Sequence, residues 1–365
     1  MKIKLRSSIS IIERKDQVIE FFKTNTREQV LIKTHSPVLQ ELLSKADGSF
    51  TLKEYVDKHQ LHHIYFELEK FIEFLHRKGI LSNVEEETLD KYDVYRRNIH
   101  FIEDYSTSPA QLVYMWNNIR QAKVAIVGLG AVGTWVATNL IQSGVQHLIL
   151  MDNDIVENTN LHRQFGYKEK DIGRLKAEAL KDTLQSMNQH ATIDIIAKLL
   201  DEKALGKYMS NDVDLIINCA DIPNVDVTSL WIGEYCMKYR IPHIVGGGYN
   251  MHLSLIGQTV LPYDTACVKC FEKQLKEINK IDPNSVRKLS VKNRKIGSFG
   301  PMCALIASFI GMEAIKVLTR CIRPANVNRR GEFNIYTMDT TYREFERLEA
   351  CEWCGGNQIE HSATD

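Results

Sequence analysis

A glycine-rich turn and a carboxylate at the ends of two apolar runs are the strongest candidates for chemistry in this sequence. The first run is Val124–Val127. Three glycines follow it at the spacing that joins a strand to the N-terminus of a phosphate-binding helix: Gly128, Gly130 and Gly133. The second run, His147–Met151, ends at Asp152, where a carboxylate can hold ribose hydroxyls. The pattern predicts a βαβ nucleotide site.

A cluster of polar residues comes directly after Asp152. It contains a carboxylate, amides and a guanidinium: Asp154, Asn158, Asn160, Arg163 and Gln164. Ligands of open α/β sheets lie at the carboxyl ends of the strands, so these groups would face the ligand. The glycine fingerprint alone favours NAD or FAD, whereas the added cluster suits a triphosphate and its metal.

Two further residues extend the candidate site, each with a simpler alternative reading. Lys176 opens a helical pattern three residues after Gly173 and could approach phosphates as a point charge, or could be an ordinary solvated helix residue. Asp221 follows the apolar stretch Val213–Cys219. It is either a turn-forming residue or a ligand of Mg²⁺, which carboxylates usually hold together with phosphates.

These motifs, in this order, resemble the ATP-binding and adenylation site of the ubiquitin-activating-enzyme-like superfamily, which includes ThiF, MoeB and HesA. The segments CADIPN, EYCMKYRIPHIVGGGY and YDVYRRNIH resemble most its branch that modifies ribosomally made peptides, typified by MccB and PaaA. The resemblance implies that Asp152 binds ribose, that Arg163 and Lys176 bind phosphates and that Asp221 organises Mg²⁺. It also implies a homodimer, in which Arg97, or less favourably Arg96, reaches the ATP of the partner subunit.

The sequence departs from the family pattern at two places. Ala131 replaces a usual glycine, which the start of a helix should tolerate, and no arginine follows Asp221 at the spacing of MoeB-like enzymes.

Relatives that activate carrier proteins use a nucleophilic cysteine in a loop that corresponds to residues 271–302, and this segment contains no cysteine here. Cys303 begins an apolar helical pattern, where a buried thiol is a poor nucleophile. We therefore expect chemistry to stop at adenylation and transfer to an ordinary acceptor.

Two Cys-x-x-Cys pairs predict a structural zinc site with four thiolate ligands: Cys267, Cys270, Cys351 and Cys354. The long separation between the pairs leaves a redox pair or two unrelated pairs open. Reduced thiols fit a cytoplasmic protein.

The 46 basic and 46 acidic residues give the chain no overall charge for binding nucleic acid or a membrane. The apolar helix predicted after Cys303 contains Glu313 and Lys316, which favours a core helix over a membrane span.

The first 88 residues are predicted to form a separate module, joined by a linker at 83–90 to an adenylating domain at 89–365. Residues 8–34 predict an antiparallel meander, and helices are predicted at 37–45, 52–59 and 66–78, followed by a strand at Ile80 and Leu81. This is a winged-helix-like α+β pattern. Residues 1–90 carry 14 Lys or Arg against 15 Asp or Glu, which argues against DNA. The module resembles leader-peptide-recognition domains, which capture a peptide as an added strand; the alternative is a packing or dimerisation module.

The sequence as a whole predicts an α/β enzyme with a Rossmann-like, mostly parallel sheet that uses MgATP to adenylate a carboxyl or carboxamide group of a precursor peptide, in maturation of a peptide natural product such as an antibiotic. Three other functions stay open. They are adenylation of a ubiquitin-fold sulfur-carrier protein, NAD-dependent redox chemistry, and non-catalytic peptide binding.

Overall fold

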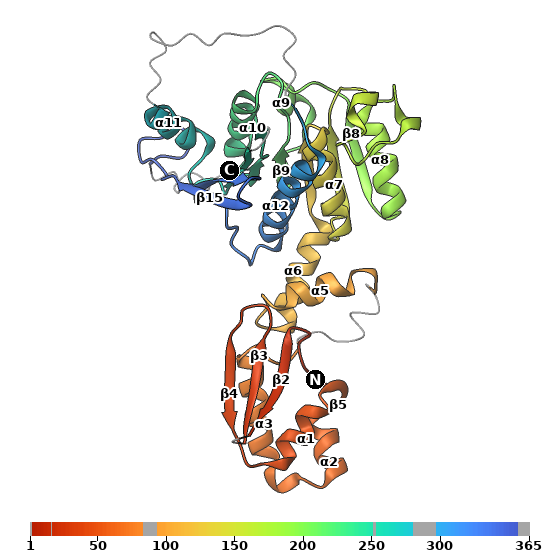
Figure 1. Cartoon of the computed structure of the whole chain (residues 1–365), viewed down its shortest axis with the longest axis vertical. Helices are drawn as coiled ribbons and strands as arrows, with labels where there is room; N and C mark the ends of the chain where they lie inside the picture. The colour runs from red at the N-terminus through yellow and green to blue at the C-terminus, as the bar shows by residue number, and fades with distance from the viewer. Residues whose placement is uncertain (1, 16, 83–92, 251–252, 280–296, 357–365) are drawn as a thin grey trace, which may run out of the picture. The chain divides into compact units, whose positions relative to one another are not determined.

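The computed structural model describes residues 2–15, 17–82, 93–250, 253–279 and 297–356. The chain divides into two compact units, Met1–Asn117 and Asn118–Asp365 (Figure 1). The division falls later in the chain than the predicted boundary after residue 88. The predicted linker at 83–90 lies outside the described residues.

The first unit contains two small antiparallel sheets. Its strands are β1 (Lys2–Lys4), β2 (Ile9–Arg14), β3 (Val18–Lys23), β4 (Gln29–Lys33) and β5 (Asp47–Thr51). Strands β2, β3 and β4 form a meander in that order, which confirms the meander predicted at 8–34. The other sheet pairs β1 with β5, two strands that the sequence did not predict. The strand predicted at Ile80 and Leu81 is wrong, since Leu81 forms only an isolated bridge with Leu5.

Helices cover one face of the meander, and the three α-helices lie at the predicted places. They are α1 (Pro37–Ser44), α2 (Leu52–His59), η1 (His62–Ile64) and α3 (Tyr65–Arg77). Thr51 and Glu54 form a capping box at the start of α2, and Gly79 has a φ of +65° just after α3, where a left-handed residue ends a helix. The core lies between these helices and the inward side chains of the sheet, with Phe21, Leu42 and Leu75 fully buried.

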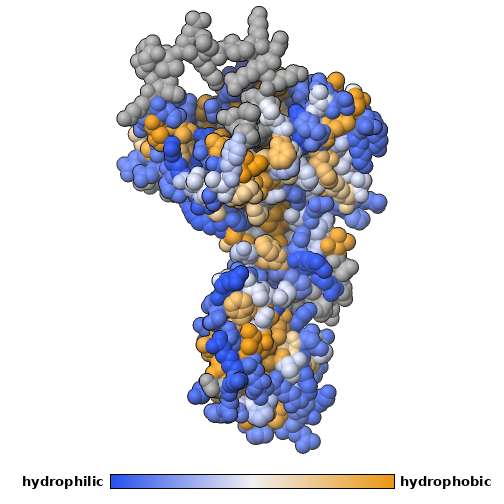
Figure 2. All heavy atoms as spheres, in the orientation of Figure 1, coloured by the Kyte–Doolittle hydropathy of each residue, from blue (hydrophilic) through white to orange (hydrophobic). Residues whose placement is uncertain are grey.

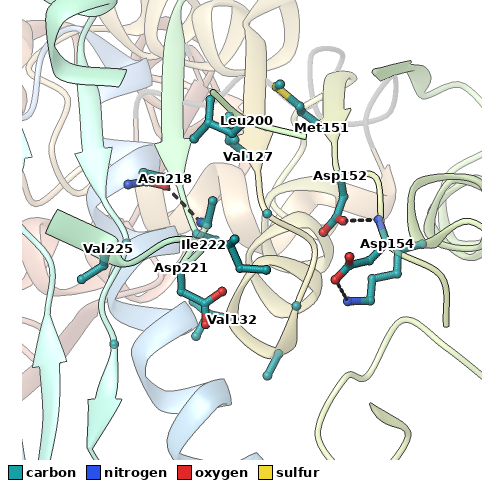
Figure 3. Close-up of a pocket in the computed structure, with 18 of the residues that line it drawn as sticks. Val127, Val132, Met151, Asp152, Asp154, Leu200, Asn218, Asp221, Ile222 and Val225 are labelled. Atoms are coloured by element: carbon teal, nitrogen blue, oxygen red, sulfur yellow. Dashed lines mark hydrogen bonds and ion pairs between the residues drawn. The ribbon is translucent and has the colours of Figure 1, made fainter. Parts of the chain in front are cut away.

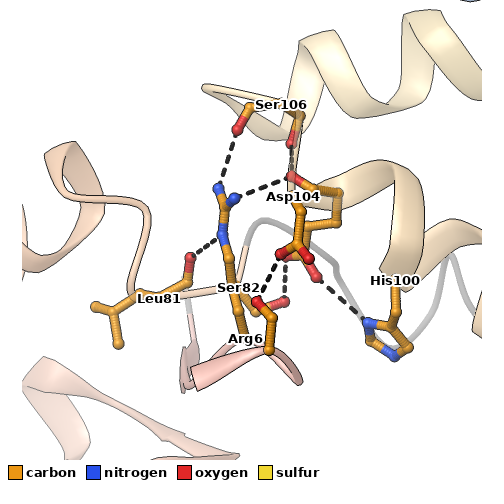
Figure 4. A network of polar contacts seen from close by, with 8 residues as sticks. Arg6, Leu81, Ser82, His100, Asp104 and Ser106 are labelled. Atoms are coloured by element: carbon orange, nitrogen blue, oxygen red, sulfur yellow. Dashed lines mark hydrogen bonds and ion pairs between the residues drawn. The ribbon is translucent and has the colours of Figure 1, made fainter. Parts of the chain in front are cut away.

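A buried arginine joins this small fold to the helices that follow it. The unit continues through η2 (Asp93–Tyr95), α5 (Arg96–Glu103) and the start of α6 (Pro109–Gln121). Arg6 Nε donates to the carbonyl of Leu81, Nη1 to that of Glu103 and Nη2 to that of Ser106, each at 3.0 Å (Figure 4). The buried carboxylate of Glu103 accepts a 2.7 Å hydrogen bond from Ser82 Oγ. This network explains why the compact unit extends beyond residue 88.

The second unit is built on a six-stranded sheet in the order β13-β10-β9-β6-β7-β8. These strands are β6 (Lys123–Val127), β7 (His147–Met151), β8 (Thr192–Ile196), β9 (Leu215–Asn218), β10 (His243–Val245) and β13 (Thr259–Val260). All neighbours are parallel except β10 and β13. The predicted α/β class and mostly parallel sheet are confirmed. The chain order reverses between β6 and β9, which makes their carboxyl ends the expected place for a ligand.

Helices cover both faces of this sheet (Figure 1). They are α7 (Ala131–Gln142), α8 (Lys176–Met187), α9 (Ala204–Tyr208), α10 (Val225–Tyr239), α11 (Val268–Asn279) and α12 (Gly300–Thr319). Alternate residues of β6 and β7, such as Val127 and Met151, pack with α9 and α10. Helix α7 contacts β6 and α12 on the other side. Burial on both faces explains why these strands appear in the sequence as continuous apolar runs.

A second, antiparallel sheet completes this unit, in the order β11-β12-β14-β15. Its strands are β11 (Tyr249–Asn250), β12 (Leu253–Ile256), β14 (Arg329–Asn334) and β15 (Asp339–Glu344). Helix α12 contacts β12 and is mostly buried. Among the described residues it is the one helix whose length and composition would allow a membrane span, and its burial is typical of a core helix.

Surface colouring by hydropathy shows apolar atoms over the strands of the small unit (Figure 2). They belong to the outer face of the meander, where Ile12 and Leu31 are 46% and 53% exposed. These two residues flank Glu20 in one cross-strand row of β2, β3 and β4. The meander therefore has one face in the core and one partly apolar face in solvent.

Candidate functional site

A cavity of about 810 Å³ lies at the carboxyl ends of β6, β7 and β9 (Figure 3). Eight of the residues predicted from the sequence line it: Gly128, Gly130, Asp152, Asp154, Asn160, Arg163, Lys176 and Asp221. They come from segments far apart in the chain, which the parallel sheet brings to one edge. Three other predicted residues, Gly133, Asn158 and Gln164, do not line the cavity.

The glycines of the turn after β6 serve different purposes. Gly128 has a φ of +89°, and a Cβ there would lie 2.5 Å from the backbone carbon of Cys219. Gly130 lines the cavity as the N-cap of α7, where the first N–H groups of a helix have no acceptor within it and can meet a ligand. A Cβ on Gly133 would lie 2.0 Å from the carbonyl oxygen of Gly128. Gly133 thus lets α7 begin close to the turn, and Ala131 forms the first helical residue as expected.

Asp152 holds the strand ends together. Its Oδ2 accepts a 2.7 Å hydrogen bond from the N–H of Leu129. Its Oδ1 accepts a 2.8 Å bond from the N–H of Asp154 (Figure 3). Each carboxylate oxygen keeps a second lone pair, which can accept a ribose hydroxyl. The side chain can therefore shape the turn and bind a sugar at the same time.

Lys176 is a buried cation at the start of α8. Only 7% of the residue is exposed, and its Nζ lies 2.9 Å from Oδ2 of Asp154. The N–H of Lys176 also donates to the carbonyl of Asp154. A buried ammonium costs free energy unless an anion compensates it. Because Lys176 lines the cavity, a phosphate could take over part of the role that Asp154 plays here.

The loop between Asp152 and α8 is held by its own polar side chains. Asn160 Oδ1 accepts from the N–H of Glu157 at 3.0 Å and closes η3 (Asn158–Asn160). Arg163 Nη1 donates to the carbonyl of Thr159 at 2.6 Å, which keeps its guanidinium beside the cavity. Gln164 is buried, and its Oε1 has no partner in the described part of the chain.

Asp221 lies on the exposed turn after β9, and a buried amide fixes that turn. Asn218 Oδ1 accepts from the N–H of Ala220 at 3.0 Å. Its Nδ2 donates to Thr228 Oγ1 and Ser229 Oγ at 3.1 Å each, both on α10. Asn218 also lines the cavity, although sequence reasoning did not single it out. A polar residue at the end of a buried strand was the signal available.

Other lining residues were missed as well. Gly246, Gly247 and Gly248 follow β10, and a Cβ on Gly246 would lie 1.9 Å from the carbonyl oxygen of Asn218. The run of three glycines was the available signal. Lys198, Leu199 and Leu200 follow β8, which pairs with β7, the strand that Asp152 follows. The two leucines give this part of the cavity an apolar wall, which could contact the flat face of a nucleotide base.

Arg97 belongs to the other unit. It lies on α5, where it is exposed to solvent, and the cavity is lined by residues between 127 and 298. Of the other cysteines, Cys303 is buried and donates to the carbonyl of Phe299. Burial and the charge of Asp221 raise the pKa of Cys219 to about 12. Neither thiol has the exposed, acidic character of a nucleophile.

The four predicted zinc ligands come together in one buried cluster. The Sγ atoms of Cys267, Cys270, Cys351 and Cys354 all lie within 4.8 Å of one another. The Cys267–Cys270 separation is 3.8 Å, and the two pairs that cross between motifs are 3.5 and 3.4 Å apart. A tetrahedral ion with Zn–S bonds of about 2.3 Å would place its sulfurs about 3.8 Å apart. The cluster therefore fits zinc.

Fold and cavity together define an ATP-dependent adenylyltransferase of the ThiF type. A model of the ThiF family matches residues 95–354, and the chain belongs to that family. It is 29% identical over 242 residues to the molybdopterin-synthase adenylyltransferase of Escherichia coli K12, an alignment that covers 65% of this chain and 88% of that protein.

Solved structures resemble the chain over nearly its whole length. Crystallised E. coli MccB with AMPCPP and MccA superimposes with a TM-score of 0.74 and 23% identity, covering 97% of this chain and all of that one. PaaA superimposes with a TM-score of 0.71 and 22% identity, covering 93% and 99%. At this identity the likeness concerns the fold, and it extends over the small first unit.

The cysteine cluster predicts about one zinc ion per chain. Replacing Cys351 by serine should lower the melting temperature and the zinc content together, because metal binding is coupled to folding. Cys321→Ser, at an exposed cysteine outside the cluster, is the control and should change neither. Elemental analysis with thermal unfolding makes the measurement. A purified protein without zinc that melts like a holoprotein would contradict the prediction.

Proposed function

We propose that this chain uses MgATP to adenylate a carboxyl or carboxamide group of a ribosomally made precursor peptide, in the maturation of a peptide natural product such as an antibiotic. The observation that carries the proposal is the fusion of a ThiF-type cavity to a small unit whose meander has two edge strands that pair with no further strand among the described residues. MccB, described as a microcin C7 biosynthetic enzyme and crystallised with MccA, covers both units. The alignment with the molybdopterin-synthase enzyme covers 65% of this chain.

The proposed reaction needs an electrostatic site more than a nucleophile of its own. An oxygen of the peptide attacks the α-phosphorus of ATP, the bond from that phosphorus to the bridging oxygen breaks, and pyrophosphate leaves. The N–H groups at the start of α7 would stabilise the phosphate charge, and Arg163 and Lys176 would offset the charge that develops on the pyrophosphate. Asp221 would hold Mg²⁺, which neutralises phosphate charge when bound.

The edges of the meander are the proposed capture site for the peptide. In the sheet β2-β3-β4, β2 and β4 each have one side that pairs with no other strand of that sheet. An extended peptide can add to such an edge through backbone hydrogen bonds. Ile12 on β2 and Leu31 on β4 would then contact its side chains on the outer face. We propose that residues 1–88 act as this peptide clamp.

Arg97 is proposed to act in a second copy of the chain. On α5 it lies one turn before Phe101, which is 65% exposed, and Phe101 packs edge-on against Tyr105 with ring centroids 5.9 Å apart. Residues spaced by four share one face of a helix, so the guanidinium lies on an exposed aromatic stripe. Aromatic residues and arginine are enriched in protein interfaces. This stripe supports a homodimer in which Arg97 reaches the partner's ATP.

Adenylation of a ubiquitin-fold sulfur carrier is the second candidate function. It is favoured by sequence similarity to the molybdopterin-synthase adenylyltransferase. The two candidates differ in the partner that stimulates exchange of pyrophosphate into ATP. A Gly-Gly-tailed carrier should support exchange in one case, and a peptide encoded by a short reading frame beside the gene should support it in the other.

Loss of the phosphate-facing cation or of the metal-binding carboxylate should stop ATP-to-AMP turnover. Lys176→Met and Asp221→Asn keep side-chain volume, and each should slow turnover by roughly two or more orders of magnitude. Lys170→Met and Asp226→Asn, at exposed positions outside the cavity, are matched controls. Thermal unfolding checks the fold. Near-normal turnover in both cavity variants would mean that the site is misassigned.

Mixing two inactive variants tests whether Arg97 acts across subunits. Arg97→Ala and Asp221→Asn, mixed in equal amounts after subunit exchange, should regain about a quarter of the wild-type activity. Half of the dimers would be mixed, and each would have one intact site. The mixture of Lys176→Met with Asp221→Asn, two variants in the cavity of one subunit, is the control and should regain no activity. Failure to regain activity despite proven exchange would contradict action in trans.

Shortening one apolar side chain beside the peptide-binding edge should weaken capture of the peptide. Leu31→Ala on β4 or Ile12→Ala on β2 should raise the KM for the peptide by about fivefold to tenfold, because buried apolar contact is lost. The KM for ATP should stay unchanged. Leu253→Ala, at an exposed leucine of the second unit, is the control. If neither edge variant changes the KM for the peptide, the clamp role is excluded.

A further inference from the structure

Tyr167 is a buried residue whose hydroxyl meets the glycine turn. It follows the polar loop and precedes α8, and 5% of it is exposed. Its Oη donates to the carbonyl oxygen of Leu129 at 2.8 Å. Burial, with the nearby carboxylates of Asp152 and Asp154, raises the pKa of Tyr167 well above its ordinary value. The phenol therefore keeps its proton and acts as a donor at neutral pH.

Leu129 is held on both of its peptide bonds. Its N–H donates to Asp152 at 2.7 Å, and its carbonyl accepts from Tyr167. Leu129 follows Gly128 and precedes Gly130 in the turn, and its side chain is fully buried. The middle residue of the turn is thus fixed by two side chains that come from different places in the chain, one from the end of β7 and one from the loop before α8.

The Leu129 carbonyl determines where the next N–H points. In a planar trans peptide the C=O and the following N–H point in opposite directions. Tyr167 holds the Leu129 carbonyl toward the protein interior, so the N–H of Gly130 is directed the other way. Gly130 lines the cavity and is the N-cap of α7, whose N–H has no acceptor within the helix.

We propose that Tyr167 is a positioning residue for the phosphate subsite, which aims the Gly130 N–H at a nucleotide phosphate by holding the Leu129 carbonyl. The inference rests on the proposed ATP site and adds a residue that touches neither substrate nor metal. It predicts a specific defect: loss of the hydroxyl weakens the binding of phosphates and leaves the subsite for the nucleoside intact.

Tyr167→Phe tests this role, with Tyr235→Phe as the matched control. Tyr235 is also buried and donates to a backbone carbonyl, that of Met209, at 3.2 Å. Neither Met209 nor Ser210 after it lines the cavity, whereas Gly130 after Leu129 does. Both variants lose one buried hydrogen bond. Only Tyr167→Phe should raise the dissociation constant and the KM for ATP, by about fivefold or more, with a smaller change in kcat.

Adenosine separates positioning from general damage to the cavity. Its inhibition constant against ATP should be the same in wild type and Tyr167→Phe, because adenosine has no phosphate. An equal loss of adenosine and ATP affinity, unchanged ATP affinity, or failure of Tyr167→Phe to fold while Tyr235→Phe folds would each overturn the proposal. A wild-type protein that does not bind ATP would instead refute the proposed function.

Discussion

The carboxylate of Asp152 sets the relation between two neighbouring strand ends, and the nucleotide cavity depends on it. Parallel pairing places Val127 of β6 beside Met151 of β7. One oxygen of Asp152 then binds the turn after β6, and the other binds the loop after β7. The N–H of Lys176 donates to the carbonyl of Asp154, so the start of α8 is also positioned relative to the Asp152 carboxylate. A single anionic side chain thus aligns glycine turn, loop and cation.

Arg6 has a comparable role in the first unit. Burial lowers the pKa of its guanidinium, and the charges of Glu103 and Asp104 oppose that shift. One of its three hydrogen bonds goes to Leu81, and the other two fasten the small fold to Glu103 at the end of α5 and to Ser106 in the turn after it. The proposed peptide clamp and Arg97 are therefore parts of one compact unit, so a peptide that binds the sheet binds the same body that carries the arginine.

The elements that form the cavity could be predicted where a short stretch of sequence determines the secondary structure. The strands at 124–127 and 147–151 are apolar because both faces are buried, and Lys176 begins α8 after the predicted glycine. Strand β5 was missed because Asp47, Gly48 and Ser49 have the composition of a turn, while the pairing partner, β1, lies more than forty residues earlier.

Residues whose role depends on tertiary neighbours could not be predicted. Asn218 and Gly246 serve the cavity because β9 and β10 are adjacent in the sheet, which no local pattern reveals. Gly133 was predicted as a cofactor contact from the fingerprint. In the structure the position of a Cβ on Gly133 is occupied by the Gly128 carbonyl, so this glycine allows close packing of the turn against α7. The cysteine cluster was predictable despite the long sequence separation of its two Cys-x-x-Cys pairs. Each pair is a local motif that supplies two zinc ligands, so the spacing between the pairs is not restricted.

The cysteine cluster joins residues that are 84 positions apart, such as Cys267 and Cys351. A link of that span removes much conformational freedom from the unfolded chain. Synthesis runs from the N-terminus, so the residues that line the cavity, the last of which is Ser298, all leave the ribosome before Cys351 does. The strand ends that surround the nucleotide can therefore assemble while the cluster still lacks half of its thiols.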